Sequence, residues 1–197
     1  MLLGLDVGGT FTDAVIIDGH RVVATAKRRT TKDNLMNGIG EALDAVLEGY
    51  DTSNIEQVTL STTVVTNTIV EAKEQVVDLY VITGPGRNVD DIFPVEPIYL
   101  QGYTDHRGIV VERTPADAVR GIANMVQARS GTDLAAVSAK FGVRNPQEEL
   151  SITEELKNTY HTISNGSLLS GSLNFPRRTI SAYFNSAVTP VFTVFKK

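Results

Sequence analysis

Residues 3–17 read LGLDVGGTFTDAVII, the pattern of a strand, a tight glycine turn and a second strand. Asp6 ends the first strand, and hydroxyl side chains and backbone amides are concentrated in the turn. Adjacent glycines allow close approach to a ligand, and successive N–H groups in such a turn form a concave anion site. A carboxylate there suits Mg²⁺, which keeps several waters and takes few protein carboxylates. The stretch predicts a phosphate-binding hairpin for a nucleotide–magnesium complex, while a plain hairpin with a Gly-Gly turn is the alternative.

The composition is that of an ordinary globular chain. The 197 residues are 42% hydrophobic and 21% charged, with a formal net charge of -5, which is enough for a domain with a real core. The mild acidity argues against nucleic acid as the main partner. Cys is absent, which excludes disulfides and thiolate zinc sites. Because no apolar run approaches the roughly 20 residues of a membrane helix and no signal peptide is recognisable, we expect no membrane partner and a cytoplasmic location.

The order of elements predicts the fold class. Residues 1–28 hold three apolar segments joined by tight turns, which predicts an antiparallel meander. A helix capped by Asp33, a strand at 57–60, a helix at 62–72 and a nearly all-apolar strand at 76–83 follow. An all-apolar strand is typical of the centre of a parallel sheet. We therefore expect an α/β fold with a mixed sheet, in which a three-strand antiparallel meander is followed by αβαβ with helices on both faces.

The rest of the chain gives a looser pattern. It predicts a hairpin from residues 98–104 and 109–113, a helix capped by Thr114, a buried strand at 134–141 and a helix capped by Asn145. Ser164–Asn174 is rich in Ser and Gly and is interpreted as a linker or mobile loop, followed by an amphipathic segment to Pro190. These divisions predict three parts: 1–83 with the phosphate hairpin, 84–163 as a further α/β part, and 164–197 as a loop plus helix.

Several other patterns point to structure rather than chemistry. No G-x-x-x-x-G-K-[ST] motif occurs, so the chain is not a P-loop protein, and Gly84-Pro85-Gly86 lacks the third glycine of a dinucleotide fingerprint. The three histidines lack metal-ligand spacing. Three charged pairs are interpreted as solvated surface: the acidic pairs Glu148-Glu149 and Glu154-Glu155, and the basic pair Arg177-Arg178, for which contact with phosphate or a partner domain is the alternative.

Two motifs carry a family resemblance. The hairpin closely resembles the first phosphate loop of the actin/hexokinase/heat-shock ATPase superfamily, and DVGGTFTD at Asp6–Asp13 resembles the signature of the hydantoinase/oxoprolinase family. Sugar kinases of this superfamily share the Asp-x-Gly-Gly-Thr core but usually continue with Lys. STTVVTNTIVE at Ser61–Glu71 is similar to the Gly-Thr-Thr-x-x-Thr-Asn stretch of the family, with Ser61 in place of the usual Gly. Weaker similarities at 105–108, 141–149 and 178–190 extend the resemblance over nearly the whole chain.

The resemblance implies a chemistry. Family members use ATP and magnesium to open cyclic amides such as hydantoins or 5-oxoproline, or to activate related carbonyl compounds. Phosphorylation of the carbonyl oxygen makes the carbon electrophilic enough for water. Carried over, Asp6 would hold Mg²⁺ through water, and Asp13 would be a second catalytic residue that orients the turn or a water, or would simply bond backbone amides of the hairpin. The implied phosphate cradle comprises Gly8, Gly9, Thr10, Phe11 and Thr12, with Thr63 and Asn67 facing the same cleft.

The superfamily clamps ATP between two lobes, yet no second Gly-Gly-Thr hairpin follows. We therefore expect an N-terminal region that binds nucleotide weakly and turns over poorly alone, with a remaining lobe or partner subunit and a small cyclic amide substrate. Two alternatives stay open. One is a small-molecule kinase of the same superfamily, although the kinases usually have Lys where this chain continues with Phe11-Thr12-Asp13. The other is a non-catalytic nucleotide-binding or assembly module.

Overall fold

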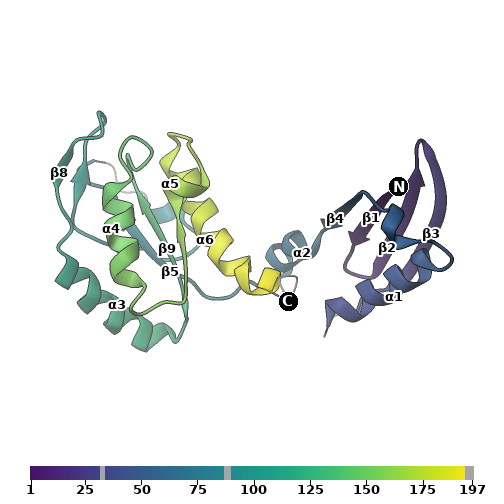
Figure 1. Ribbon diagram of the computed structural model, residues 1–197. Coiled ribbons are helices and arrows are strands. Elements are labelled where there is room, and N and C mark those ends of the chain that lie inside the picture. Colours follow the sequence, from purple (N-terminus) through teal and green to yellow (C-terminus); the bar gives the residue numbers. More distant parts are fainter. Residues whose placement is uncertain (32–33, 87–89, 194–197) are drawn as a thin grey trace. The chain divides into compact units, whose positions relative to one another are not determined.

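A computed structural model of the protein describes residues 1–31, 34–86 and 90–193. The chain forms two compact units, of which the first comprises Met1–Lys73 with residues 191–197 and the second Glu74–Pro190. Each unit has a sheet with helices packed on it (Figure 1), and the chain contains both antiparallel and parallel strand pairs. The predicted α/β fold with an antiparallel meander and a mixed sheet is confirmed.

The first unit is built on a four-stranded sheet in the order β3-β2-β1-β4. The strands β1, β2 and β3 pair antiparallel and β4 pairs parallel with β1, so the predicted meander and crossover are present. The crossover helix α1 is capped by Asn34, whose side chain accepts a bond from the Met36 amide; the predicted cap Asp33 lies outside the described residues. The bounds are β1 Leu2–Val7, β2 Phe11–Asp18, β3 Arg21–Arg29, α1 Leu35–Leu47, the 3₁₀ helix η1 Thr52–Asn54, β4 Gln57–Thr62 and α2 Val64–Val70.

Alternation along β1 separates the two faces of this sheet. Leu3, Leu5 and Val7 are buried in a core shared with α1, where each such side chain contributes about 1.5–3 kcal/mol. Gly4 and Asp6 lie on the opposite face because successive side chains of a strand alternate. The meander therefore presents Asp6 away from the core. The helix α1 adds Ile39, Ala42 and Val46 to the buried side.

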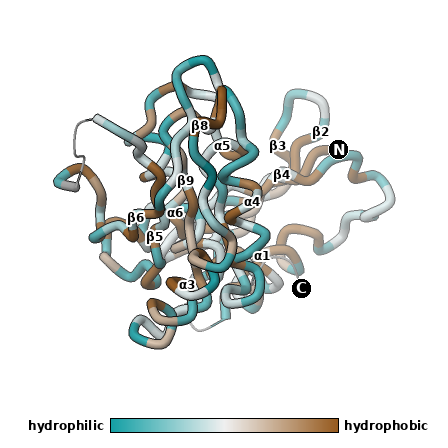
Figure 2. The backbone as a smooth tube through the Cα atoms, turned by 90° about the vertical axis from the view of Figure 1, so that its left-hand side faces the viewer, coloured by the Kyte–Doolittle hydropathy of each residue, from teal (hydrophilic) through white to brown (hydrophobic). Residues whose placement is uncertain are grey.

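The second unit contains a parallel sheet in the order β10-β9-β5-β6. All five residues of β5 are buried, and the strand is strongly apolar (Figure 2), as predicted for a central parallel strand. Tyr80 and Ile82 pack with α3 and α4, whereas Leu79 and Val81 pack with α6, so helices cover both faces. The bounds are β5 Asp78–Ile82, η2 Asp90–Ile92, β6 Ile98–Tyr99, β7 Tyr103–Thr104, β8 Val110–Glu112, α3 Ala116–Ser130, β9 Leu134–Ala139, α4 Gln147–Leu156, β10 Thr162–Asn165, α5 Gly166–Leu169 and α6 Phe175–Thr193.

Charged side chains interpreted as solvated are buried in the second unit. Glu148 is 3% exposed and Glu149 is fully buried, so the solvated-face interpretation is wrong for this pair. The physical reason is a set of backbone donors that need acceptors. The carboxylate of Glu149 accepts bonds from the amides of Ala139 and Ser167, each at 2.7 Å, and Glu148 accepts from the Thr114 amide at 3.0 Å. A buried carboxylate persists here because these bonds replace water.

The surface interpretation of Arg178 is also wrong, since this side chain is 1% exposed. Its guanidinium donates to the carbonyl of Ser172 at 2.8 Å, to that of Lys140 at 3.3 Å and to that of Ala139. Burial lowers the pKa of Arg178, and the neighbouring carboxylate of Glu149 opposes this shift by favouring the charged form. Arg178 thus ties α6 to the end of β9.

The predicted loop Ser164–Asn174 begins as regular structure. Ser164 and Asn165 end β10 and are each 5% exposed, and α5 follows directly. The Asn165 side chain accepts bonds from the amides of Ser167 and Leu168, which caps this short helix. The Ser164 hydroxyl accepts from Nδ2 of Asn185 at 2.9 Å and lies 2.6 Å from the Ser186 hydroxyl, so the first residues of this Ser- and Gly-rich segment belong to the packed sheet rather than to a linker.

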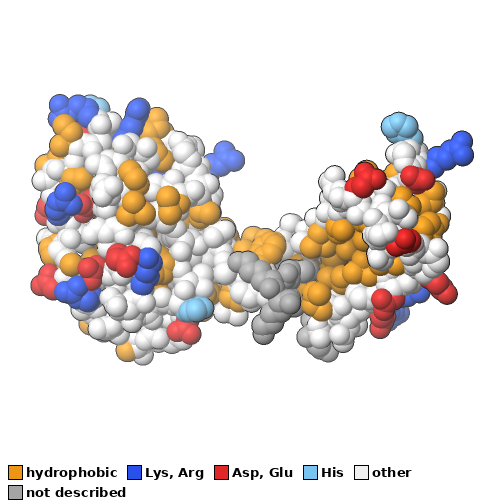
Figure 3. All heavy atoms as spheres, viewed as in Figure 1, with side chains coloured by type: hydrophobic (Ala, Val, Ile, Leu, Met, Phe, Trp, Pro, Cys, Tyr) orange, Lys and Arg blue, Asp and Glu red, His pale blue; other side chains and the backbone are white. Residues whose placement is uncertain are grey.

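Polar and apolar side chains share the surface of both units. Acidic and basic side chains are mixed on the visible face of the second unit (Figure 3). In the first unit hydrophobic side chains also reach the surface, including Val58 at 59% and Leu60 at 47% exposure on the edge strand β4. Among the described residues no helix combines the length and apolarity that crossing a membrane requires.

Candidate functional site

The glycine turn between β1 and β2 leaves two backbone donors at its tip. The Gly8 amide donates to the Phe11 carbonyl at 3.0 Å, which closes the turn around Gly9 and Thr10. Within the described part of the chain, the amides of Gly9 and Thr10 have no hydrogen-bond acceptor. Gly9 is partly exposed and Thr10 is exposed. Two adjacent free N–H groups on a tight turn are the donors that an anion such as phosphate accepts.

The glycines are required here for space rather than for backbone handedness. Neither Gly8 nor Gly9 has a positive φ. A Cβ on Gly9 would lie 2.8 Å from Nδ2 of Asn67, and a Cβ on Gly8 would lie 3.0 Å from the Phe11 carbonyl oxygen. The missing side chain of Gly9 therefore lets the Asn67 amide of α2 reach the turn. The structure brings together the two sequence blocks, 6–13 and 61–71, that the resemblance singled out.

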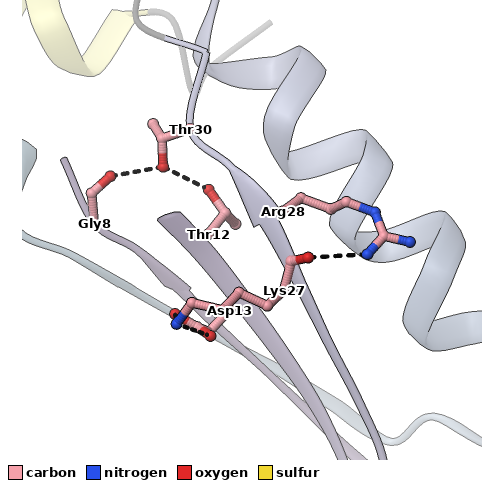
Figure 4. A network of polar contacts seen from close by, with 6 residues as sticks. All are labelled: Gly8, Thr12, Asp13, Lys27, Arg28 and Thr30. Atoms are coloured by element: carbon pink, nitrogen blue, oxygen red, sulfur yellow. Dashed lines mark hydrogen bonds and ion pairs between the residues drawn. The ribbon is translucent and has the colours of Figure 1, made fainter. Parts of the chain in front are cut away.

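Thr30, which directly follows β3, holds the turn in place through hydrogen bonds. Its hydroxyl donates to the Gly8 carbonyl at 2.8 Å and lies 3.1 Å from the hydroxyl of Thr12 (Figure 4). Its amide donates to the Thr10 carbonyl at 2.9 Å. Thr12 is fully buried and its hydroxyl contacts that of Thr30, whereas Thr10 lies at the tip of the turn. Sequence reasoning missed Thr30, although a residue that directly follows β3 is expected near the tip once β2 and β3 are paired.

The second block contacts the turn through one side chain. Nδ2 of Asn67 lies 3.4 Å from Oγ1 of Thr63, and the Thr63 amide donates to the Val7 carbonyl at 3.3 Å. Thr63 precedes α2 without a capping side-chain bond. A pocket opens beside these groups. Its wall within residues 1–73 is formed by Gly8, Gly9, Thr30, Asn34, Leu35, Val64, Asn67, Thr68, Glu71 and Lys73, the last two of which form an ion pair.

A row of polar side chains crosses the open face of the same sheet. Asp6 on β1 is directly opposite Asp13 on β2, Asp13 is opposite Lys27 on β3, and Asp6 is opposite Ser61 on β4. Nζ of Lys27 donates to both carboxylate oxygens of Asp13, at 2.8 and 3.1 Å, and lies 5.0 Å from the centre of the Phe11 ring. A hollow of about 550 Å³ lies over this face and includes Asp6, Asp13 and Lys27 in its lining.

Asp6 is the free carboxylate of this row. It is exposed and makes no hydrogen bond or ion pair with any described residue, whereas Asp13 is paired with Lys27. The described residues contain no group of three or more His, Asp or Glu side chains that could enclose a metal. A lone free carboxylate does fit a hydrated Mg²⁺ that arrives with phosphate ligands, because this ion retains waters and needs one or two carboxylates.

The weaker sequence similarities have structural roles. Asp105 is 6% exposed in the turn between β7 and β8, where it accepts bonds from the Ile109 and Arg107 amides. The bond from the Ile109 amide is the main reason that the pKa of Asp105 lies below its usual value. The Asn145 side chain accepts from the Gln147 amide at 3.1 Å just before α4, whose cap residue is Pro146 rather than the predicted Asn145. These residues shape turns and helix ends.

A family model described as the hydantoinase/oxoprolinase N-terminal region matches residues 2–160. Among solved structures, a nucleotide-free acetone carboxylase from a study of ATP-dependent acetone carboxylation has a TM-score of 0.76 at 18% identity. An ATP-dependent caprolactamase from Pseudomonas jessenii has a TM-score of 0.69 at 19% identity. They are matched over 98% and 99% of this chain but over 33% and 32% of their own, so the chain spans about a third of their length. A search of curated proteins finds no match.

Proposed function

The chain belongs to the hydantoinase/oxoprolinase N-terminal family, and from this premise we propose that its first unit binds the phosphates of magnesium-ATP at the turn between β1 and β2. The observation that carries the proposal is the pair of free amides on Gly9 and Thr10, held in place by Thr30 and approached by Asn67. Preorganised backbone donors of this kind suit phosphoryl transfer, whose catalysis is mainly positioning and charge stabilisation.

Each residue has a role in this proposal. Gly8, Gly9 and Thr10 form the rim of the phosphate cradle, and Phe11 and Thr12 support it from the first residues of β2. Asn67, next to Thr63, adds a side-chain amide beside Gly9. Asp6 holds a water of the magnesium ion, and Asp13 orients polar groups on the same face.

The proposed reaction is the ring opening of a cyclic amide by a longer protein that contains this region. Bound ATP would supply the phosphoryl group that activates the amide carbonyl oxygen toward water. The role of this chain is then to hold the phosphates and the hydrated cation in a fixed geometry. In this proposal the substrate contacts and the second phosphate loop would come from another lobe or subunit, which agrees with the chain spanning about a third of the length of the proteins it resembles in fold. Because the proposed reaction consumes ATP, a cytoplasmic location is part of the proposal.

Nucleotide titration of the 197-residue chain followed by ¹⁵N–¹H NMR tests the binding site directly, even at weak affinity. We expect magnesium-ATP to shift the Gly9 and Thr10 amides first and the isolated chain to show no substantial ATP hydrolysis. Asp6→Asn should remove the magnesium dependence of these shifts, whereas the matched control Asp18→Asn, at the far end of β2, should not. Shifts confined to the second unit would refute the proposal.

A further inference from the structure

The open face of the first unit places two carboxylates side by side. Asp6 and Asp13 are direct partners in the antiparallel pair of β1 and β2, so their Cβ atoms are about 5 Å apart. Like charges directly opposite each other destabilise a sheet, and two carboxylates that share a site favour capture of a cation or a proton. An arrangement with both groups free would bind divalent cations without any nucleotide.

Lys27 makes the two carboxylates unequal. Its ammonium group contacts both oxygens of Asp13, and the Phe11 ring lies beneath it within cation–π distance. Both partners are about half exposed, at 58% for the lysine side chain and 49% for the aspartate. A pair this exposed adds little stability, so its effect is on the local charge rather than on folding. Asp6 has no such partner among the described residues.

We infer that Lys27 is a positioning residue that engages Asp13 and leaves Asp6 as the single free carboxylate for the hydrated cation. This inference rests on the proposed nucleotide site, and it adds which of the two carboxylates is available to the cation. One free carboxylate beside a lysine attracts a bare divalent cation weakly. The same carboxylate holds the cation firmly once phosphate oxygens supply further ligands. Lys27 thereby makes cation binding depend on nucleotide.

Substitutions at Lys27 and Asp13 separate this role from others. Removal of the ammonium group in Lys27→Gln frees Asp13, so two carboxylates face the same space. The cation is then attracted by the Asp13 carboxylate as well as by Asp6, and it is no longer repelled by the ammonium group of Lys27. At this degree of exposure the expected gain in affinity for free Mn²⁺ is about tenfold. Lys27→Arg should behave as the unchanged protein, since a guanidinium also pairs with both oxygens of a carboxylate.

The experiment measures Mn²⁺ binding to the 197-residue chain by the loss of the free-ion EPR signal, without nucleotide. We expect Lys27→Gln to bind Mn²⁺ about tenfold more tightly and Lys27→Gln with Asp13→Asn to return to the original affinity. The control Arg21→Gln removes the same charge at the other end of β3 and should change little. Circular dichroism confirms folding of each variant.

Two results would overturn the inference. The first is an unchanged Mn²⁺ affinity in Lys27→Gln. The second is an increase that persists when Asp13 is also replaced, since Lys27 would then act by long-range charge alone. Failure of the proposed function is a different result, because it appears as unshifted Gly9 and Thr10 amides in the nucleotide titration, whatever the Mn²⁺ data show.

Discussion

Substitution of Gly38 by alanine tests whether α1 locks the segment that supports the turn. A Cβ on Gly38 would lie 2.8 Å from the Arg29 carbonyl oxygen and 3.2 Å from the Thr31 amide nitrogen. Both contacts are to backbone, which cannot rotate away as a flexible side chain can. On the same helix, a Cβ on Gly40 meets nothing within 4 Å. The pair Gly38→Ala and Gly40→Ala therefore differs in contact while sharing the change in helix propensity.

The two magnitudes follow from these contacts. Alanine in place of glycine inside a helix gains about 1 kcal/mol, so Gly40→Ala should stabilise the first unit by up to that amount. At Gly38 the same gain is opposed by overpacking, which costs about 1–3 kcal/mol, so this variant should be neutral to about 2 kcal/mol less stable. The strain falls on Arg29–Thr31, and Thr30 is the residue that bonds the Gly8 carbonyl. Gly38→Ala should also disturb the turn.

Hydrogen exchange of the backbone amides measures both effects. In the regime where exchange reports local opening free energies, amides of α1 should be better protected in Gly40→Ala and less protected in Gly38→Ala. Amides of the second unit serve as an internal control. The NMR signals of Gly8, Gly9 and Thr10 should move only in Gly38→Ala. Equal stabilisation by both substitutions, with an unmoved turn, would refute the claim that α1 fixes the support of the phosphate cradle.

Two further predictions concern the second unit. Burial raises the pKa of Tyr80 to about 12, and burial together with the hydroxyl of Tyr80 raises that of Tyr160, whose hydroxyl donates to Asp78. The folded state therefore retains protons that an unfolded tyrosine loses near pH 10, so Tyr80 alone should lower stability by about 3 kcal/mol as the pH rises from about 10 to 12, and Tyr160 should add to this decline. Urea denaturation over this range checks the decline, and Tyr80→Phe should make it shallower; an equal slope in that variant contradicts the assignment. Glu149→Gln should destabilise the unit by about 3 kcal/mol, because one of the two buried acceptor oxygens becomes a donor that faces an amide, and the negative charge beside the buried Arg178 is lost. The exposed control Glu154→Gln should change the urea midpoint little, and similar midpoints in both variants would count against the buried network.

Much of the fold could be predicted from the sequence, because the spacing of apolar residues and the residues that form turns are properties of short stretches of chain. Alternation along 3–7 and 14–16 and the Asp18-Gly19 turn define the meander, and the burial of β5 follows from its apolar run. The sheet that β5 joins could not be predicted in this way, since an apolar strand fits the centre of any parallel sheet. It pairs with β6 and β9, and no local feature of residues 78–82 specifies those partners.

The buried charges show a second limit of pattern reasoning. Glu149 lies on a helix with other acidic residues, and nothing in its neighbours distinguishes it from a solvated side chain. Its burial depends on two amides, those of Ala139 and Ser167, which come from other parts of the chain. Arg178 likewise finds carbonyl acceptors near the end of β9. Such residues become predictable only when the donors and acceptors that they satisfy are already placed in space.

Only part of the candidate site could be predicted from the sequence. The exception is Lys27, whose position depends on one extra residue in the pairing of β2 with β3. The turn residues and Asn67 carry recognisable motifs, but the position of Lys27 depends on register. Counted back from the turn where Asp18 pairs with Arg21, a regular ladder would place Ala26 opposite Asp13 and send Lys27 to the other face. The bulge between Ile16 and Ile17 shifts the pairing by one residue, so that Ile16 pairs with Ala24 and Asp13 with Lys27. Because side chains alternate with a period of two, this shift turns the lysine onto the face that carries both carboxylates. The charge balance of the proposed cation site thus depends on a backbone irregularity that residue types alone do not reveal.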